Sequence, residues 1–151
     1  MQNYQDPSPR IMDFHARILP PHDAVQYVLP FGPSANHLYR GTGRNRTRTE
    51  AYDHWHHLAT GLILQQRAKM TMKAIPPTRY CAGVLVSPLD VNGLDKADLD
   101  NRIKAMLDVL QFMRVTPNDS LCDSIVTQRE AMMEPGWTQV AVWPFNVGKA
   151  T

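Results

Sequence analysis

One short polar stretch, KADLDNRIK at residues 96–104, carries the side chains of this sequence best suited to chemistry. Two carboxylates, Asp98 and Asp100, stand one residue apart, and Asn101 and Lys104 follow closely. Mg²⁺ takes oxygen ligands, commonly one or two carboxylates together with substrate phosphates. A lysine beside such a site can neutralise the charge that grows on a phosphate during its cleavage. The stretch therefore predicts a Mg²⁺ site, with Mn²⁺ as the alternative metal.

The same carboxylates have an ordinary structural explanation. An Asp at the N-cap or in the first turn of a helix accepts backbone N–H bonds and complements the helix dipole, which contributes roughly 0.5–2 kcal/mol. A cap needs one carboxylate, whereas here two stand together beside Asn101 and Lys104. The candidate for a third metal ligand is Asp119, in the stretch NDSLCD that also contains Asp123.

The elements that position these groups are predicted by periodicity and turn residues. Strands are expected at residues 24–30, 79–87, 120–129 and 138–143, with the turn Glu134–Gly136 between the last two. Helices are expected from just after Thr49 to about residue 72, and over a segment that includes residues 99–110. The order β-α-β-α-β-β predicts an α+β fold with a small mixed sheet and two helices.

Each predicted helix has an apolar stripe at helical spacing. In the first helix, which Thr49 would cap, the stripe is Trp55, Leu58, Ala59, Leu62 and Ile63. In the second helix, the stripe is Leu99, Ile103, Met106, Leu107 and Leu110. Asp100, Lys104 and Asp108 are spaced four residues apart along a different face. The second helix is therefore expected to bury one face and to present this polar row on another.

Composition indicates a single globular domain. The chain has 151 residues, of which 43% are hydrophobic, and an irregular arm is expected at residues 1–23, ahead of a domain at residues 24–151. Its two cysteines, Cys81 and Cys122, lie in apolar stretches and are interpreted as packing residues. No apolar run reaches the roughly 20 residues of a membrane span, and the N-terminus lacks a signal-peptide layout. These features predict a cytoplasmic protein without a membrane partner.

Basic residues cluster in one segment, although the net charge of +2 is too small by itself to indicate a nucleic-acid partner. Residues 31–49 are punctuated by Gly, Pro and Asn and are expected to be loop, and the basic stretch from Arg40 to Glu50 is expected to be mobile. This loop carries Arg40, Arg44, Arg46 and Arg48. The segment is either a solvated turn or a phosphate-binding surface, and guanidinium groups are well suited to bidentate phosphate contact.

Aromatic and histidine residues have competing explanations. His54, His56 and His57 crowd the first predicted helix without a set of partner ligands, so we interpret them as surface or interface residues and not as a zinc site. Phe31 and Tyr39 suit stacking on nucleobases, or packing of the loop against the sheet.

The motif D-L-D-N-x-x-K-x-x-x-D-x-L at Asp98–Leu110, followed by N-D-S at Asn118–Ser120, resembles the RusA family of Holliday-junction resolvases of bacteria and their phages. The run LPFGPSANHLYR at Leu29–Arg40 is similar to the family's early proline-rich segment, which ends in a Tyr-Arg pair. The resemblance covers about residues 24–144 in the same order of elements. It implies that residues 24–151 form a RusA-like nuclease domain.

The resemblance implies roles for individual residues. Asp98, Asp100 and Asp119 would hold the metal, Lys104 would be the catalytic lysine, and Asn101 and Asp108 would support them. The chain departs from the family at Asn118, where two adjacent acidic residues are common, and a neutral oxygen there would weaken metal binding. With this context, we favour the metal site over helix capping, and DNA contact for the arginine loop.

These observations predict a Mg²⁺-dependent, structure-selective endonuclease that cleaves a phosphodiester by in-line attack of an activated water. The resemblance implies Holliday junctions as substrate, recombination and repair as the process, a homodimer as the active form, and a bacterial or phage origin. Two alternatives remain open. One is a branched-DNA-binding protein of the same fold that does not cleave, and the other is a metal-dependent nucleotide phosphohydrolase that would not need the arginine loop.

Overall fold

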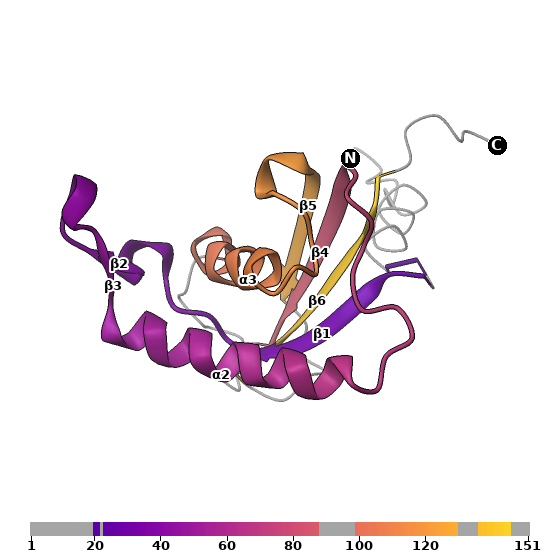
Figure 1. The fold of residues 1–151 in the computed structure, drawn as a ribbon, viewed down its shortest axis with the longest axis horizontal. Coiled ribbons are helices and arrows are strands. Elements are labelled where there is room, and N and C mark those ends of the chain that lie inside the picture. Colours follow the sequence, from indigo (N-terminus) through magenta and orange to yellow (C-terminus); the bar gives the residue numbers. More distant parts are fainter. Residues whose placement is uncertain (1–19, 22, 88–98, 130–135, 146–151) are drawn as a thin grey trace, which may run out of the picture.

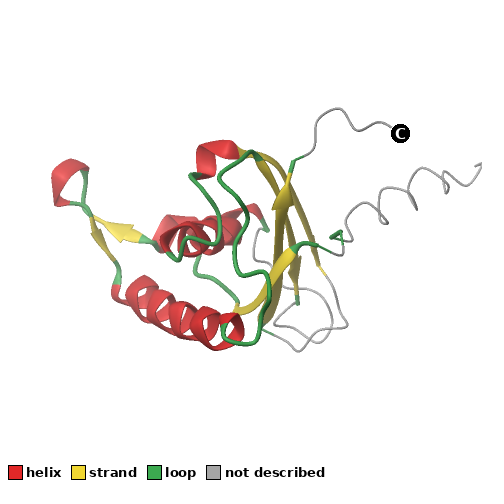
Figure 2. Ribbon diagram, turned by 45° about the vertical axis from the view of Figure 1, so that its right-hand side comes forward, coloured by secondary structure: helices red, strands yellow, loops and turns green. Residues whose placement is uncertain are grey.

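The computed structural model describes residues 20–21, 23–87, 99–129 and 136–145. A four-stranded sheet has the order β1-β6-β4-β5, where the strands are β1 (Val25–Pro30), β4 (Tyr80–Val86), β5 (Cys122–Arg129) and β6 (Trp137–Pro144). β5 runs parallel to β4, whereas β6 is antiparallel to both β1 and β4. Two helices, α2 (Glu50–Arg67) and α3 (Asp100–Phe112), lie on one face of this sheet (Figures 1 and 2). The α+β class, the mixed sheet and the predicted order of elements are confirmed.

The face of the sheet toward the helices forms the core. In β1 the residues Val25, Tyr27 and Leu29 are buried, while Val28 is exposed. Tyr27 pairs with Val140 of β6, and Val140 pairs in turn with Val84 of β4. This register lines up buried side chains across three strands, against which both helices pack.

Helix α2 begins where its sequence predicts. The Thr49 hydroxyl accepts a hydrogen bond from the Tyr52 backbone N–H at 3.2 Å and caps the helix. The buried residues of the helix are Tyr52, Trp55, His56, Ala59 and Ile63. Leu58 was expected in the buried stripe but is exposed, because at about 100° per residue it lies roughly 120° around the helix from the Tyr52–Ala59 line. The helix ends at Arg67, although its end was predicted near residue 72. Its last carbonyls accept hydrogen bonds from the backbone N–H groups of Ala68 and Lys69.

Helix α3 buries the predicted apolar stripe, since Met106, Leu107 and Leu110 are buried and Leu99 and Ile103 pack against the core. Two arginines fix its position. Arg102 donates to the Gly32 carbonyl at 2.9 Å, and Arg67 of α2 donates to the Met113 carbonyl at 2.6 Å. Gly32 permits the close approach, because a Cβ at that position would lie 3.2 Å from the Arg102 carbonyl oxygen.

The segment expected to be a loop, residues 31–49, contains a two-stranded antiparallel hairpin. Strands β2 (Tyr39–Arg40) and β3 (Thr47–Arg48) pair around a single turn of 3₁₀ helix, η2 (Gly43–Asn45). Two-residue strands are too short to show the alternation by which strands are predicted. The hairpin projects from the body of the protein beyond the start of α2 (Figures 1 and 2).

Several expectations concern residues that the structure does not describe. The arm at residues 1–23 lies almost entirely outside the described residues, as do Asp98 and most of the turn at Glu134–Gly136. No helix in the part of the chain that the structure describes combines the length and apolarity needed to cross a membrane.

Candidate functional site

Three adjoining hollows line the side of the molecule where α2, α3 and the hairpin meet. The acidic hollow, about 490 Å³, lies between α3 and β5 and is lined by Asp100, Ile103, Lys104, Leu107, Asp108, Asp119, Cys122, Ile125 and Thr127. The aromatic hollow, about 410 Å³, shares Lys104, Asp108 and Asp119 with it and adds Tyr39, Arg48, Tyr52, His56, Gln111 and Phe112. The histidine hollow, about 500 Å³, shares Arg48, His56 and Phe112 and adds Asp53, His54, His57 and Thr60. Together they form one continuous surface.

The polar row predicted on α3 lies along the acidic hollow. Asp100 is the first residue of the helix and is exposed, and its Oδ1 accepts a hydrogen bond from the Asn101 N–H at 3.0 Å. The Lys104 Nζ lies 3.1 Å from Asp108 Oδ1, one turn further along the helix. The side chain of Asp108 is only 23% exposed, so the ion pair orients Lys104 toward the hollow more firmly than a fully solvated pair would.

Asp119 comes to the same place from a separate segment, the 3₁₀ turn η3 (Asp119–Leu121). Its Oδ2 lies 4.0 Å from Lys104 Nζ, so the ammonium group stands between Asp108 and Asp119. The Asp119 backbone N–H donates to the Gln111 side-chain carbonyl at 3.0 Å, which ties this turn to the C-terminal end of α3. Asn118 caps the turn by accepting from the Ser120 N–H at 2.9 Å, so its amide oxygen has a local structural role.

The structure thus brings Asp100, Lys104, Asp108 and Asp119 into one hollow, while Asp98 lies outside the described residues. Among the described residues, no three carboxylate, imidazole or thiol groups converge closely enough to make up a metal site by themselves. The donor set nevertheless suits Mg²⁺, which binds through one or two carboxylates and keeps several waters. Asp100 and Asp119 are the exposed carboxylates able to serve in this way.

The rival explanation weighed for Asp100, a backbone bond in the first turn of a helix, is present, because its Oδ1 accepts from the Asn101 N–H there. This bond occupies one carboxylate oxygen, and the N-cap residue is Leu99, which has no capping side chain. A carboxylate has two oxygens and about four lone pairs. The bond to Asn101 therefore leaves lone pairs of the Asp100 carboxylate open to a further ligand.

The four hairpin arginines do not reach the hollows equally. Arg48 lines the aromatic and histidine hollows, with its guanidinium 5.3 Å from the Tyr52 ring centroid and 3.6 Å from Asp53 Oδ1. The Arg46 guanidinium stacks 4.0 Å above the Tyr39 ring. Arg40 and Arg44 are exposed on the hairpin and do not line the hollows.

The rings of Phe31 and Tyr39 pack against protein groups. Arg102 lies 4.8 Å above the Phe31 ring, and Tyr39 contacts Tyr52 edge-on at 5.8 Å between ring centroids. Of the two interpretations given for these rings, packing is therefore what the structure shows.

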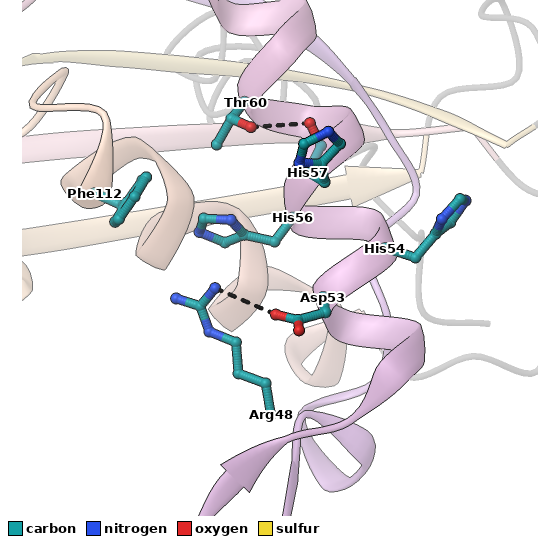
Figure 3. A pocket seen from close by; sticks show the side chains of 7 residues that line it. All are labelled: Arg48, Asp53, His54, His56, His57, Thr60 and Phe112. Atoms are coloured by element: carbon teal, nitrogen blue, oxygen red, sulfur yellow. Dashed lines mark hydrogen bonds and ion pairs between the residues drawn. The ribbon is translucent and has the colours of Figure 1, made fainter.

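The three histidines of α2 face different directions (Figure 3). His54 and His56 project from opposite sides of the α2 ribbon in Figure 3, although both line the histidine hollow. The His56 ring turns toward Phe112 of α3, with 4.8 Å between the ring centroids. His54 and His57 are exposed, whereas His56 is only 6% exposed, so of the surface or interface positions expected for the three histidines a surface position is wrong for His56. It packs here because it shares the buried face of α2 with Tyr52 and Ala59.

Burial sets the protonation of the groups beneath the aromatic hollow. It lowers the pKa of His56 below the ordinary 6.5, an effect that nearby Arg48 reinforces, so the imidazole is neutral at pH 7. Burial, followed by the Asp108 charge, raises the pKa of Tyr52 to about 12. Burial also raises the pKa of the Cys122 thiol, which lines the acidic hollow, so the thiol stays protonated, in agreement with a packing role.

Phe112 and Gln111 were not identified as site residues from the sequence. A signal for Phe112 was present, because it continues the row of Asp100, Lys104 and Asp108 at the next interval of four residues. An aromatic residue on the polar face of a helix is a departure from the amphipathic pattern. Gln111 gave no such signal, since its contact with Asp119 depends on the path of the chain after α3.

Comparison with models of known protein families and with curated proteins finds no match to this chain.

Proposed function

We propose that this protein is a Mg²⁺-dependent, structure-selective endonuclease that resolves branched DNA, in line with its resemblance to the RusA family. The observation that carries the proposal is the position of Lys104, whose ammonium group lies between the carboxylates of Asp108 and Asp119 in a hollow that Asp100 also lines. Carboxylates from two separate segments beside a lysine are typical of phosphoryl-transfer sites that use a divalent metal.

Each described residue then has a defined task. Asp100 and Asp119 would hold Mg²⁺, together with Asp98 as the resemblance implies. When bound, Mg²⁺ polarises the phosphate and lowers the pKa of a bound water. Lys104 stabilises negative charge on the scissile phosphate, and Asp108 holds the lysine in position through their 3.1 Å ion pair. Arg48 contacts the DNA backbone beside the site, and Arg40, Arg44 and Arg46 extend this contact along the hairpin.

A homodimer is part of the proposal. A four-way junction has two-fold symmetry, and its resolution requires cuts in two opposing strands, which a single acidic hollow cannot make in one encounter. A closed two-fold dimer presents two such sites. Light scattering is expected to give twice the 17.1 kDa chain mass at micromolar concentration, and a monomer on junction DNA would contradict the dimer.

The decisive experiment uses purified protein and a labelled four-way junction, with linear duplex of the same sequence as the control. We expect junction binding without metal and strand cleavage only after Mg²⁺ or Mn²⁺ is added, with little cleavage of the duplex. Binding without cleavage in either metal would instead indicate a branched-DNA-binding protein. Hydrolysis of free nucleotides that does not change when the hairpin arginines are replaced would indicate a phosphohydrolase.

A further inference from the structure

Phe112 is an exposed aromatic residue in a charged surface. It is 61% exposed at the end of α3 and lines both the aromatic and the histidine hollow. Leu58 and Leu64 on α2 are similarly exposed, at 47% and 56%, but neither lines a hollow. Scattered exposed leucines are ordinary on a protein surface, whereas a ring placed beside reacting groups suggests a ligand.

The surroundings of Phe112 hold its ring in place without covering it. Its neighbour His56 faces it in Figure 3 and meets it at 73° between ring planes. Tyr52 in turn meets His56 at 85°, with 5.9 Å between the ring centroids. Perpendicular contacts of this kind fix a ring without supplying a stacked partner. Most of the Phe112 ring therefore remains open to a planar group from a ligand.

The charges nearby restrict what that ligand is. Arg48 reaches the gap beside His56 and Phe112 from the end of β3, where its guanidinium lies 3.6 Å from Asp53 Oδ1 (Figure 3). Lys104 lines the aromatic hollow together with Phe112 and is paired with Asp108. An open aromatic ring that shares two hollows with the Arg48 guanidinium matches a molecule that is planar at one end and anionic at the other. A nucleotide has both features, because every base has a π-face and every nucleotide carries a phosphate.

We propose that Phe112, supported by His56, is a stacking site for one unpaired nucleobase, with the phosphate of that nucleotide held by Arg48. The ligand class is then branched DNA with an unpaired nucleotide at the branch, such as a flap or a gapped fork, bound in addition to the four-way junction of the proposed function. The inference rests on the proposed function in that it takes DNA as the ligand, but it does not require cleavage.

The test measures binding without divalent metal, so that no strand is cut. The probe is a flap DNA with 2-aminopurine as the unpaired base at the branch, and the reference is a fully paired duplex. We expect wild-type protein to quench the 2-aminopurine fluorescence by stacking. Phe112→Ala should abolish the quenching and bind the flap roughly 5- to 150-fold more weakly, the range for removal of one base–aromatic stack, with duplex affinity unchanged.

Two further variants separate stacking from simple apolar contact. Phe112→Tyr keeps an aromatic face and should retain both quenching and affinity. Leu64→Ala removes an equally exposed apolar side chain that lies outside the hollows and should behave as wild type. Thermal unfolding of each variant confirms that the fold is intact.

The stacking site is contradicted if the Phe112→Ala variant quenches 2-aminopurine and binds the flap as well as the wild-type protein does. It is also contradicted if this variant loses affinity equally for the flap and the duplex. It is also overturned if Phe112→Ala changes the oligomeric state, since the ring would then contact a second copy of the chain. Quenching by a wild-type protein that does not cleave in Mg²⁺ supports the stacking site and contradicts the nuclease. Absence of any DNA binding contradicts both.

Discussion

The two sides of the proposed DNA-binding surface are held in place by different means. On one side, α3 buries Ala105, Met106, Leu107, Val109 and Leu110, and side-chain hydrogen bonds tie it to Gly32 and Asp119. On the other side, residues 40–48 of the hairpin are all exposed. The hairpin contacts α2 through Tyr39, whose ring meets Tyr52 edge-on, and through Arg48 beside Tyr52, and Thr49 donates to the His37 carbonyl at 2.6 Å.

This difference corresponds to a difference in the precision that each task requires. Groups that act on a reacting phosphate must be held to within about 0.5 Å, and sites on packed helices achieve this better than sites on loops. Contacts to a DNA backbone carry no sequence information and tolerate adjustment. We therefore expect changes on α3 to affect the rate of cleavage, and changes in the hairpin to affect affinity.

The largest effect is expected from Asp100→Asn, which removes a charge from the metal site and leaves the hairpin intact. Cleavage in Mg²⁺ should fall below detection while junction affinity stays near the wild-type value. Asp23→Asn, at an exposed acidic residue outside the hollows, is the matched control. Mg²⁺-dependent cleavage by the Asp100 variant would exclude this residue as a ligand.

Lys104→Ala should lower the cleavage rate by about 10²- to 10³-fold, the usual effect of removing one group that stabilises transition-state charge. Junction affinity, measured by fluorescence anisotropy, should change much less. Lys69→Ala is the control, because Lys69 is exposed and lies outside the hollows. A parallel fall in rate and affinity would make Lys104 an ordinary phosphate contact.

Replacement of Arg44, Arg46 and Arg48 together by Ala should weaken DNA binding and flatten its salt dependence. For every DNA phosphate that an arginine no longer neutralises, the slope of log affinity against log salt falls by about 0.9 on duplex DNA, since fewer counterions are released. The matched control replaces Lys69, Lys73 and Arg114, which are three exposed cationic residues outside the hollows. Equal slopes for both triple variants would place the hairpin away from the DNA.

Thr49→Ala tests how the hairpin is joined to α2. The change removes the N-cap bond to Tyr52 and the bond to His37, and should lower the free energy of unfolding by about 1 kcal/mol. Thr60→Ala is the comparison, because the Thr60 hydroxyl bonds only to the His57 carbonyl within the same helix. Urea unfolding that shows the same decrease for both variants would contradict the capping role.

The smallest effect concerns pH. The native pKa of His56 is lowered below 6.5, so the unfolded chain binds more protons than the folded one as the pH falls below that value. The stability that the neutral His56 side chain contributes is therefore fully present above pH 6.5. It is lost as the pH drops toward the lowered pKa of His56. His56→Phe should flatten this part of the stability curve, measured by urea unfolding between pH 7.5 and 5 in about half-unit steps. An unchanged curve would assign the pH dependence to other groups.

Local patterns in the sequence predicted much of the fold and part of the site. Helix and strand periods are properties of neighbouring residues, so the order of elements, the Thr49 cap and the buried stripe of α3 could be anticipated. The alignment of Asp100, Lys104 and Asp108 also follows from helical geometry alone. The two-residue strands of the hairpin were not anticipated, because their pairing is visible only between segments.

Contacts between segments distant in the sequence were decided by tertiary structure. The approach of Asp119 to Lys104 depends on the bond that the Asp119 N–H donates to the Gln111 side-chain oxygen, and on the turn that Asn118 caps. Among the arginines of the basic segment, Arg48 lines the hollows because of where the hairpin meets α2. The His56–Phe112 contact requires two helices to pack side by side, and such packing depends on the shapes of many side chains together, which no local spacing encodes.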